Sequence, residues 1–163
     1  MENEVKTFNV LILGEGNVGK SYLLNTVRKG KLFIKALPMA NNILFSTNKG
    51  EFILSFNRDF LSKEEAGKTK VDGALIFFDV SKSDILPLDE VSEWCFSVQN
   101  NTPTILVGNK YDLIQDELTK KQLSGFIPTS AKTGFNVFEP FLQLIRCINK
   151  DYEIQFKEFE KVS

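Results

Sequence analysis

The sequence predicts a single α/β domain built on a mostly parallel β-sheet with helices on both faces. Its 163 residues are close to the usual size of one folding unit. Short apolar segments alternate with segments of helical periodicity, which is the order of elements that builds such a sheet. Several short segments, such as NVLILG at residues 9–14 and ALIFFDV at residues 74–80, are apolar on both alternating faces. Strands covered by helices on both sides need that pattern.

Eight segments of the chain have the apolar pattern of a strand or a helix. Five short ones are predicted to be strands, at residues 8–13, 43–45, 52–56, 74–80 and 104–107. Three longer ones are predicted to be helices, at residues 20–29, 88–98 and 138–150. Asn136, followed three residues later by Glu139, resembles a helix-start signature. Parallel strands joined by helices carry binding loops at their carboxyl ends, so we expect the functional residues there.

The composition is that of a globular intracellular protein. Apolar residues make up 42% of the chain and charged residues 25%, which argues against disorder. Lys and Arg (20) nearly balance Asp and Glu (21), so no excess charge favours nucleic acid or an acidic membrane. No apolar run approaches the roughly 20 residues of a membrane-spanning helix, and the acidic start MENEVK lacks the character of a secretory signal.

Cysteine and histidine usage excludes several kinds of chemistry. Cys95 and Cys147 lie far apart without metal-binding spacing, and we expect both to be reduced thiols in the core. The chain has no His, so a zinc site of Cys and His is excluded, as is a Ser-His-Asp triad. Any hydrolysis would therefore depend on positioning and electrostatics rather than on an imidazole base.

Residues 14–21 form a candidate phosphate-binding loop. Their sequence GEGNVGKS matches Gly-x-x-x-x-Gly-Lys-Ser/Thr, directly after a predicted strand and directly before a predicted helix. The glycines let successive backbone N–H groups face phosphate oxygens, and the helix N-terminus adds its positive end. Lys20 is predicted to bridge the β and γ phosphates, and Ser21 to ligate Mg²⁺. The strand and helix on either side disfavour a glycine-rich turn without a ligand. The predicted phosphate-site residues are Gly14, Glu15, Gly16, Asn17, Val18, Gly19, Lys20, Ser21 and Tyr22.

Two further loops carry groups suited to a guanine base, and they follow the predicted strand at residues 104–107 and a further short predicted strand, GFIP at residues 125–128. The first, NKYD at residues 109–112, places Asp112 where its carboxylate can accept guanine's N1–H and N2–H, a donor pair that adenine lacks. Alone, this sequence is more often a polar turn. The second, TSAK at residues 129–132, offers the backbone N–H of Ala131 to guanine O6, while two lysine stems cover the base and ribose. The predicted base-site residues are Asn109, Lys110, Asp112, Ser130, Ala131 and Lys132.

GEGNVGKS, NKYD and SAK, in this order after three strands, make the chain similar to the small GTPases of the Ras superfamily. The likeness is greatest to the Ran branch, through FSTNKGEF, LIFFDVS, the segment around Trp94, and NVFEPFLQLI. The resemblance implies a Ras-like P-loop NTPase domain over residues 1–163, with six strands and five helices. It also implies GTP or GDP and Mg²⁺ as cofactors, and protein partners that respond to the nucleotide state.

The chain departs from this family in both switch regions. The family closes its first switch on Mg²⁺ and the γ-phosphate with a Thr, but residues 27–46 contain none. The family's second switch begins with DxxG and a Gln, whereas residues 57–62 read NRDFLS. Arg58 occupies the position of the metal-binding Asp, and Asp59 could replace it if the register shifts by one. We therefore expect hydrolysis to be slow or absent while β-phosphate and base binding persist.

Three further expectations concern single residues and the chain end. Phe33 is expected to stack on the base, as an aromatic residue does in the family, although a core role is equally open. Asn17 stands where the family has a small residue, but Asn tolerates left-handed backbone. The ending EFEKVS has no CaaX cysteine, so we expect no prenyl anchor, and it lacks the acidic tail of Ran.

The sequence thus predicts a guanine-nucleotide-binding protein that acts through protein partners in the cytoplasm or nucleus, with impaired or absent hydrolysis. Two alternatives remain. In the first, the chain is an active GTPase switch in nucleocytoplasmic or vesicle transport, with Asp59, Ser62 or one of Glu64 and Glu65 replacing the missing groups. In the second, it is a pseudoGTPase without nucleotide that serves as an interaction module.

Overall fold

The computed structural model describes residues 5–30, 32–38, 41–57, 61–81, 88–116, 120 and 124–159. Their centre is a sheet of seven strands in the order β2-β3-β4-β1-β5-β6-β7. The pairs from β4 to β7 are parallel, and β2 and β3 extend the sheet in antiparallel fashion at one edge. The strands are β1 (Lys6–Leu13), β2 (Ile34–Ala36), β3 (Asn42–Thr47), β4 (Gly50–Phe56), β5 (Gly73–Asp79), β6 (Thr104–Asn109) and β7 (Ile127–Pro128).

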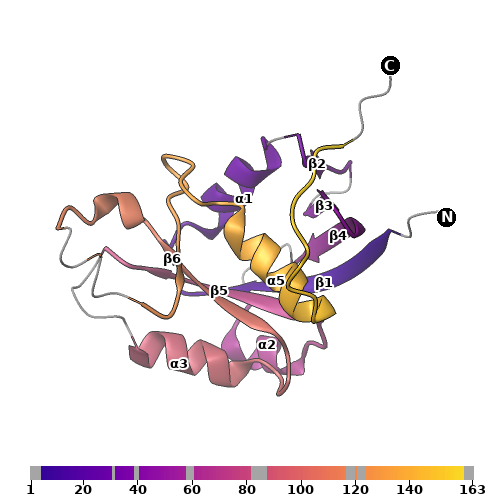
Figure 1. Ribbon diagram of the computed structural model, residues 1–163. Helices are drawn as coiled ribbons and strands as arrows, with labels where there is room; N and C mark the ends of the chain where they lie inside the picture. The colour runs from indigo at the N-terminus through magenta and orange to yellow at the C-terminus, as the bar shows by residue number, and fades with distance from the viewer. Residues whose placement is uncertain are drawn as a thin grey trace.

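Helices cover both faces of the sheet, as predicted. In Figure 1, α1 and α5 lie on one side of the strands and α2 and α3 on the other. The helices are α1 (Lys20–Arg28), α2 (Lys63–Lys68), α3 (Leu88–Ser97) and α5 (Glu139–Asn149), with a short 3-10 helix η1 (Tyr111–Leu113). None of the described helices is long and apolar enough to cross a bilayer.

The side chains of β1 alternate between the two faces of the sheet, and each face belongs to a different apolar cluster. Val10 and Ile12 belong to the cluster with α1 and α5, whereas Leu11 and Leu13 belong to the cluster with α2 and α3. Successive strand residues point to opposite faces, so a strand that is apolar at every position must be covered twice. Phe141 of α5 is fully buried and Phe138 packs against the same cluster, so both belong to the core.

The number of strands is the first correction to the sequence prediction. Six strands were implied by the resemblance, and the structure has seven because residues 34–36 pair with β3 as an extra edge strand. With Lys35 at its centre, this segment lacks the apolar run that indicates a strand in sequence. Lys35 and Ala36 are exposed on it.

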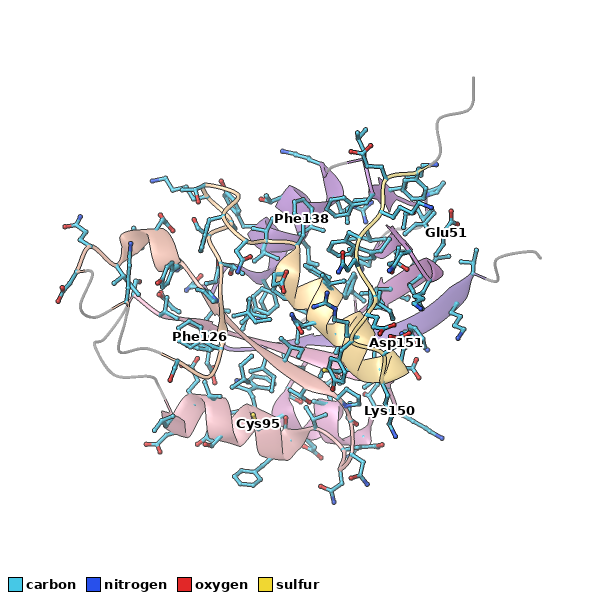
Figure 2. All side chains as sticks on the ribbon, viewed as in Figure 1. Glu51, Cys95, Phe126, Phe138, Lys150 and Asp151 are labelled. Carbon is cyan, nitrogen blue, oxygen red and sulfur yellow. The ribbon has the colours of Figure 1, made fainter. Side chains whose placement is uncertain are left out.

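Three local features differ from what the sequence analysis identified. Ser62 begins a capping box that the sequence analysis did not identify: its side chain accepts a hydrogen bond from the Glu65 N–H, and the Glu65 side chain accepts one from the Ser62 N–H, so α2 starts here. Asn136 does not cap α5; its side-chain amide donates to the Pro128 carbonyl at 3.0 Å. Cys95, labelled on α3 in Figure 2, is exposed rather than in the core.

After α5 the chain returns along the antiparallel edge, visible as the yellow segment beside β3 in Figure 1. The Asn48 N–H donates to the Gln155 carbonyl at 3.0 Å, and the Lys157 N–H donates to the Ser46 carbonyl at 2.9 Å. Ile154 is buried in this segment, with 1% of its surface exposed. We call residues 153–159 the C-terminal strap, because they cover the apolar side of β3.

Candidate functional site

The phosphate loop lies where β1 ends and α1 begins, and two of its glycines are sterically required. Gly14 has φ of 140°, and a side chain there would collide with the Phe77 carbonyl on β5. Gly19 has φ of 89°, and a side chain there would collide with the Asn109 amide. The loop is therefore packed tightly against β5 and β6, and only glycine fits at either position.

Asn17 adopts the left-handed conformation expected of it, with φ of 65°. That backbone turns the Asn17 carbonyl towards Lys110, whose ammonium donates to it at 2.6 Å. Next to it, Val18 is buried with 1% exposed and anchors the loop in the core. The loop is thus fixed by the close packing of Gly14 and Gly19 at its ends, and between them by the hydrogen bond of Asn17 and the burial of Val18.

Lys20 curls back over the loop that precedes it. Its ammonium donates to the Gly14 carbonyl at 2.5 Å and to the Glu15 carbonyl at 3.0 Å. Burial lowers the pKa of Lys20, although the charges of Glu15 and Glu90 oppose that shift. A half-buried ammonium held by neutral carbonyls favours an anion beside it.

A single buried side chain connects the three predicted loops. The Asn109 amide N–H donates to the Val18 carbonyl at 2.9 Å. The Asn109 Oδ1 accepts from the Thr129 hydroxyl at 3.2 Å and from the Ala131 N–H at 3.3 Å. The Ala131 N–H, expected to face guanine O6, is therefore directed at Asn109 in this structure. Asn109 fixes the phosphate loop relative to the base loops.

The predicted base loops enclose a cavity of about 300 Å³. Ser130 donates its hydroxyl to Asp112 Oδ1 at 2.8 Å, which fixes the orientation of that carboxylate. The cavity is lined by Gly19, Tyr22, Asn109, Lys110, Asp112, Leu113, Ala131 and Lys132. Five of the predicted base-site residues therefore line one space, with Ser130 behind it.

Asp79 is a buried carboxylate that the motifs did not reveal. It lies at the end of β5, and its Oδ2 is 3.3 Å from the Lys110 ammonium. Burial alone would raise the pKa of Asp79, but hydrogen bonds from Ser81 and Lys110 outweigh it and hold the pKa below its ordinary value. Asp79 thus stays ionised and positions Lys110 over the phosphate loop.

On its other side the phosphate loop is joined to α2 and α3. Glu15 accepts a hydrogen bond from the Trp94 indole at 3.2 Å and lies 3.5 Å from the Lys63 ammonium. Lys63 also pairs with Glu93 at 2.5 Å and lies over the Trp94 ring. The Glu93 hydrogen bond is the main cause that raises the pKa of Lys63. We call Glu15, Lys63, Glu93 and Trp94 the loop bridge.

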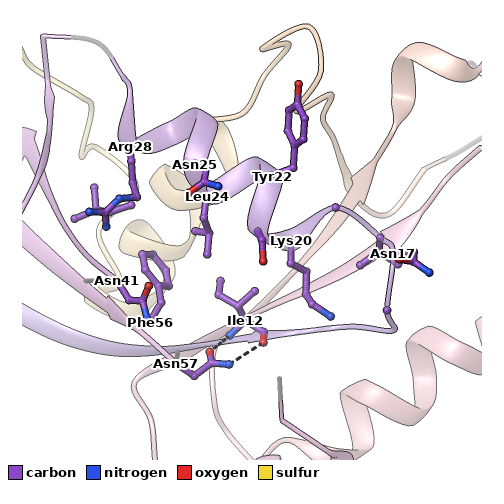
Figure 3. Close-up of a pocket in the computed structure, with 15 residues that line it drawn as sticks. Ile12, Asn17, Lys20, Tyr22, Leu24, Asn25, Arg28, Asn41, Phe56 and Asn57 are labelled. Atoms are coloured by element: carbon purple, nitrogen blue, oxygen red, sulfur yellow. Dashed lines mark hydrogen bonds between the residues drawn. The ribbon is translucent and has the colours of Figure 1, made fainter. Parts of the chain in front are cut away.

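The phosphate loop opens onto a larger cavity of about 640 Å³, shown in Figure 3. No carboxylate lines this cavity among the residues that the structure describes. Asn57, directly after β4, accepts from the Ile12 N–H at 2.6 Å and donates to the Ile12 carbonyl at 3.3 Å. The lining residues are Ile12, Gly16, Asn17, Val18, Gly19, Lys20, Ser21, Tyr22, Leu24, Asn25, Arg28, Asn41, Ile43, Phe56 and Asn57.

Arg58 and Asp59, the candidates for the metal-binding position, lie outside the described residues. Ser21, the other metal-ligand candidate, is exposed on the first turn of α1 and lines the larger cavity. Gly14 and Glu15 line neither cavity, since Gly14 is buried against β5 and Glu15 points into the loop bridge.

Phe33 does not reach the base cavity, which corrects its predicted stacking role. Its ring stacks on Phe156 of the C-terminal strap at 4.4 Å between centroids and meets Phe138 edge-on at 5.3 Å. Leu32, the residue before it, is 60% exposed and also lines neither cavity. The core role that the sequence left open for Phe33 is the one observed.

Comparisons with known proteins agree with this arrangement. The protein-family model of the Ras family matches residues 58–150, which is more than half of the chain. The chain is 27% identical to the GTP-binding nuclear protein GSP1 of Encephalitozoon cuniculi, over an alignment that covers 90% of this chain and 78% of that protein. This similarity confirms the predicted likeness to the Ran branch. On the strength of the family match and the fold, the chain belongs to the Ras family.

Proposed function

We propose that the chain binds GDP or GTP, with the phosphates on residues 14–21 and the base between Asp112 and Lys132. The observation that carries this proposal is the adjacency of the two cavities, which share Gly19 and Tyr22 as walls. A nucleotide has the same bipartite shape, with an anionic end and a flat polar end. The similarity to a GTP-binding nuclear protein supports the same ligand.

Base selection would rest on Asp112. Its carboxylate is held by Ser130 through one oxygen, which leaves the other to face a ligand. An ionised carboxylate only accepts hydrogen bonds, so it favours guanine, which offers two adjacent N–H groups, over adenine, which presents an unprotonated N1. The exposed Lys132 and half-buried Lys110 would cover the two faces of the base with their stems.

The family resemblance implies Mg²⁺, and the described residues fit it in part. Ser21 offers a hydroxyl beside the phosphate loop, and no cluster of three metal-binding side chains occurs in the described part of the chain. Mg²⁺ often keeps several waters and binds through phosphates with few protein ligands, so one hydroxyl is compatible. We therefore assign Ser21 as its protein ligand. When bound, the ion would neutralise charge on the β and γ phosphates.

We further propose that hydrolysis is slow or absent. Phosphoryl transfer needs a positioned water and charge stabilisation at the γ-phosphate. The segment at residues 27–46 has no Thr, and residues 57–62 have neither the Gly nor the Gln of the family's second switch. The protein would then act as a nucleotide-bound module for protein partners, in the cytoplasm or nucleus.

Two assays test binding and turnover separately. Chromatography of denatured, freshly purified protein should release GDP or GTP, and finding no nucleotide together with no micromolar affinity for added GDP would remove the proposal in favour of an empty interaction module. A single-turnover assay should release phosphate no faster than the Lys20→Ala variant does. Faster release by the unmodified chain would instead establish the active GTPase switch.

A further inference from the structure

The larger cavity extends beyond the part that a nucleotide would use. Its far end is formed by Asn25 and Arg28 of α1 and by Asn41 just before β3. Figure 3 shows that the Arg28 side chain points from α1 towards Asn41 and Phe56, at the opposite end of the cavity from Lys20. Since α1 rises about 1.5 Å per residue, the eight positions between Lys20 and Arg28 separate the two backbones by about 12 Å.

Among the residues that the structure describes, none provides an anionic partner for the Arg28 guanidinium. Its Nη1 atom is buried and has no hydrogen-bond acceptor, and no ion pair of Arg28 occurs among the residues that the structure describes. A partly buried charge without a counter-charge is unfavourable, because water solvates it incompletely. A water molecule could satisfy one N–H but would leave the charge uncompensated.

The charge of the whole cavity has one sign. Lys20 and Arg28 are its charged lining residues in the described part of the chain, and both are cations. Around Arg28 the lining adds the side-chain amides of Asn25 and Asn41, which can donate hydrogen bonds without adding charge. An anion at this end would meet one guanidinium and two amides, and no carboxylate of the described lining would repel it.

We propose that Arg28 forms a second oxyanion subsite, separate from the phosphate loop, with Asn25 and Asn41 as accessory donors. Its ligand is a group with two oxygens in the geometry that a guanidinium fork contacts, either a phosphate of a small molecule or the carboxylate of an acidic side chain. A nucleotide with its phosphates on residues 14–21 and its base at Asp112 leaves this end open, so both ligands can be held together.

Arginine NMR tests the subsite directly, because the chain has arginine only at positions 28, 58 and 146. Protein labelled with ¹⁵N-arginine would be saturated with GDP, and the Nε–H signal of Arg28 would be assigned by its loss in Arg28→Lys. Inorganic phosphate, or a short peptide with two adjacent glutamates, would then be added. We expect a saturable shift of the Arg28 signal with a dissociation constant in the millimolar range or tighter.

The internal control is Arg146 of α5, which donates its Nε–H to the Ile154 carbonyl at 2.7 Å. The NMR signal of Arg146 should not shift. Shifts with phosphate alone identify a small-molecule ligand, and shifts with the peptide identify an acidic side chain. No shift of Arg28 with either probe, or equal shifts of Arg28 and Arg146, overturns the proposal. If the protein binds no GDP, the same titration on Lys20→Ala still tests Arg28, so the two proposals fail separately.

Discussion

Asn109 is the residue on which the geometry of the site depends most. It is 2% exposed, and its three hydrogen bonds join the phosphate loop to both base loops. Gly19 lies so close that any side chain there would displace this amide. The phosphate and base cavities therefore share one hydrogen-bonded support, so a substitution that moves the phosphate loop also moves the base loops.

Replacing Asp112 by Asn should relax the selectivity for guanine. The variant loses a charged acceptor for the guanine N–H groups, which is worth about 1.5–3 kcal/mol, or roughly a 10-fold to 150-fold weaker affinity for GDP. Affinity for ADP should change little, which competition titrations can measure. The control is Glu51→Gln, which removes the same charge from β4, away from both cavities. An unchanged ratio of GDP to ADP affinity would contradict the assignment of Asp112.

Replacing Ser21 by Ala separates metal ligation from other roles of the hydroxyl. With Mg²⁺ present, the variant should bind GDP about tenfold more weakly, which corresponds to about 1.4 kcal/mol. With EDTA present, the variant and the unmodified chain should bind GDP equally. An equal loss under both conditions would mean that Ser21 contacts the nucleotide rather than the ion.

Among the elements, the C-terminal strap contributes most to packing that the sequence did not reveal. Phe156 stacks on Phe33 at 4.4 Å and lies 5.8 Å from Phe45, so it closes the core beside β3. Phe156→Ala should destabilise the fold by about 2–3 kcal/mol, below the roughly 3–5 kcal/mol of a fully buried Phe because Phe156 is only half-buried. Thermal and urea unfolding measure this loss.

The matched control for the strap is Phe96→Ala on α3, where the ring is 88% exposed. That substitution should change stability by no more than about 0.5 kcal/mol. Similar losses in the two variants would show that the strap adds nothing to the core.

The loop bridge connects the nucleotide loop to α2 and α3. The chain has one Trp, so its fluorescence reports on this bridge alone. GDP binding should change the Trp94 emission, because the indole N–H is bonded to Glu15 at 3.2 Å. In Glu15→Ala the change should be smaller while GDP still binds. An identical fluorescence change in both proteins would indicate that the bridge does not sense the nucleotide.

Among the elements, features set by short sequence motifs could be predicted, and contacts between residues far apart in the sequence could not. The positions of the phosphate loop and the base loops could be predicted because each is a short motif that directly follows a strand. Trp94 and Glu15 are 79 positions apart, and a contact of that kind leaves no periodic trace in one sequence. The same reason explains Phe33, whose place depends on the return of residues 153–159 along β3.

For the whole molecule, the absence of His makes stability insensitive to pH near neutrality. No side chain with an ordinary pKa titrates between about pH 6 and pH 8, so the free energy of unfolding should be constant there. The folded state lowers the pKa of Asp79, so this carboxylate stabilises the fold above its unfolded pKa, and that contribution is lost as pH falls through the folded value.

Urea unfolding at a series of pH values checks this sign. Stability should decrease below about pH 4, and Asp79→Asn should show a smaller decrease than the unmodified chain. A decrease of the same size in both proteins would assign the acid sensitivity to other carboxylates.

The order of elements along the chain could be predicted because apolar periodicity is a local property, and it led to the correct layering of helices over the sheet. The extra edge strand β2 could not be predicted, since it exists through pairing with β3 rather than through its own three residues. The place of residues 14–21 between β1 and α1 could be predicted from the spacing of the motif, whereas the extent of the cavity towards Arg28 depends on how α1 lies over β3 and β4.

The central claim is that residues 14–21 and Asp112 together hold one guanine nucleotide, and calorimetric titration tests it most directly. GDP injected into the nucleotide-free, folded protein should release or absorb heat with one site per chain and an affinity on the order of micromolar or tighter, and Lys20→Ala should weaken it. If neither GDP nor GTP gives measurable heat at two temperatures, with or without Mg²⁺, the claim is contradicted.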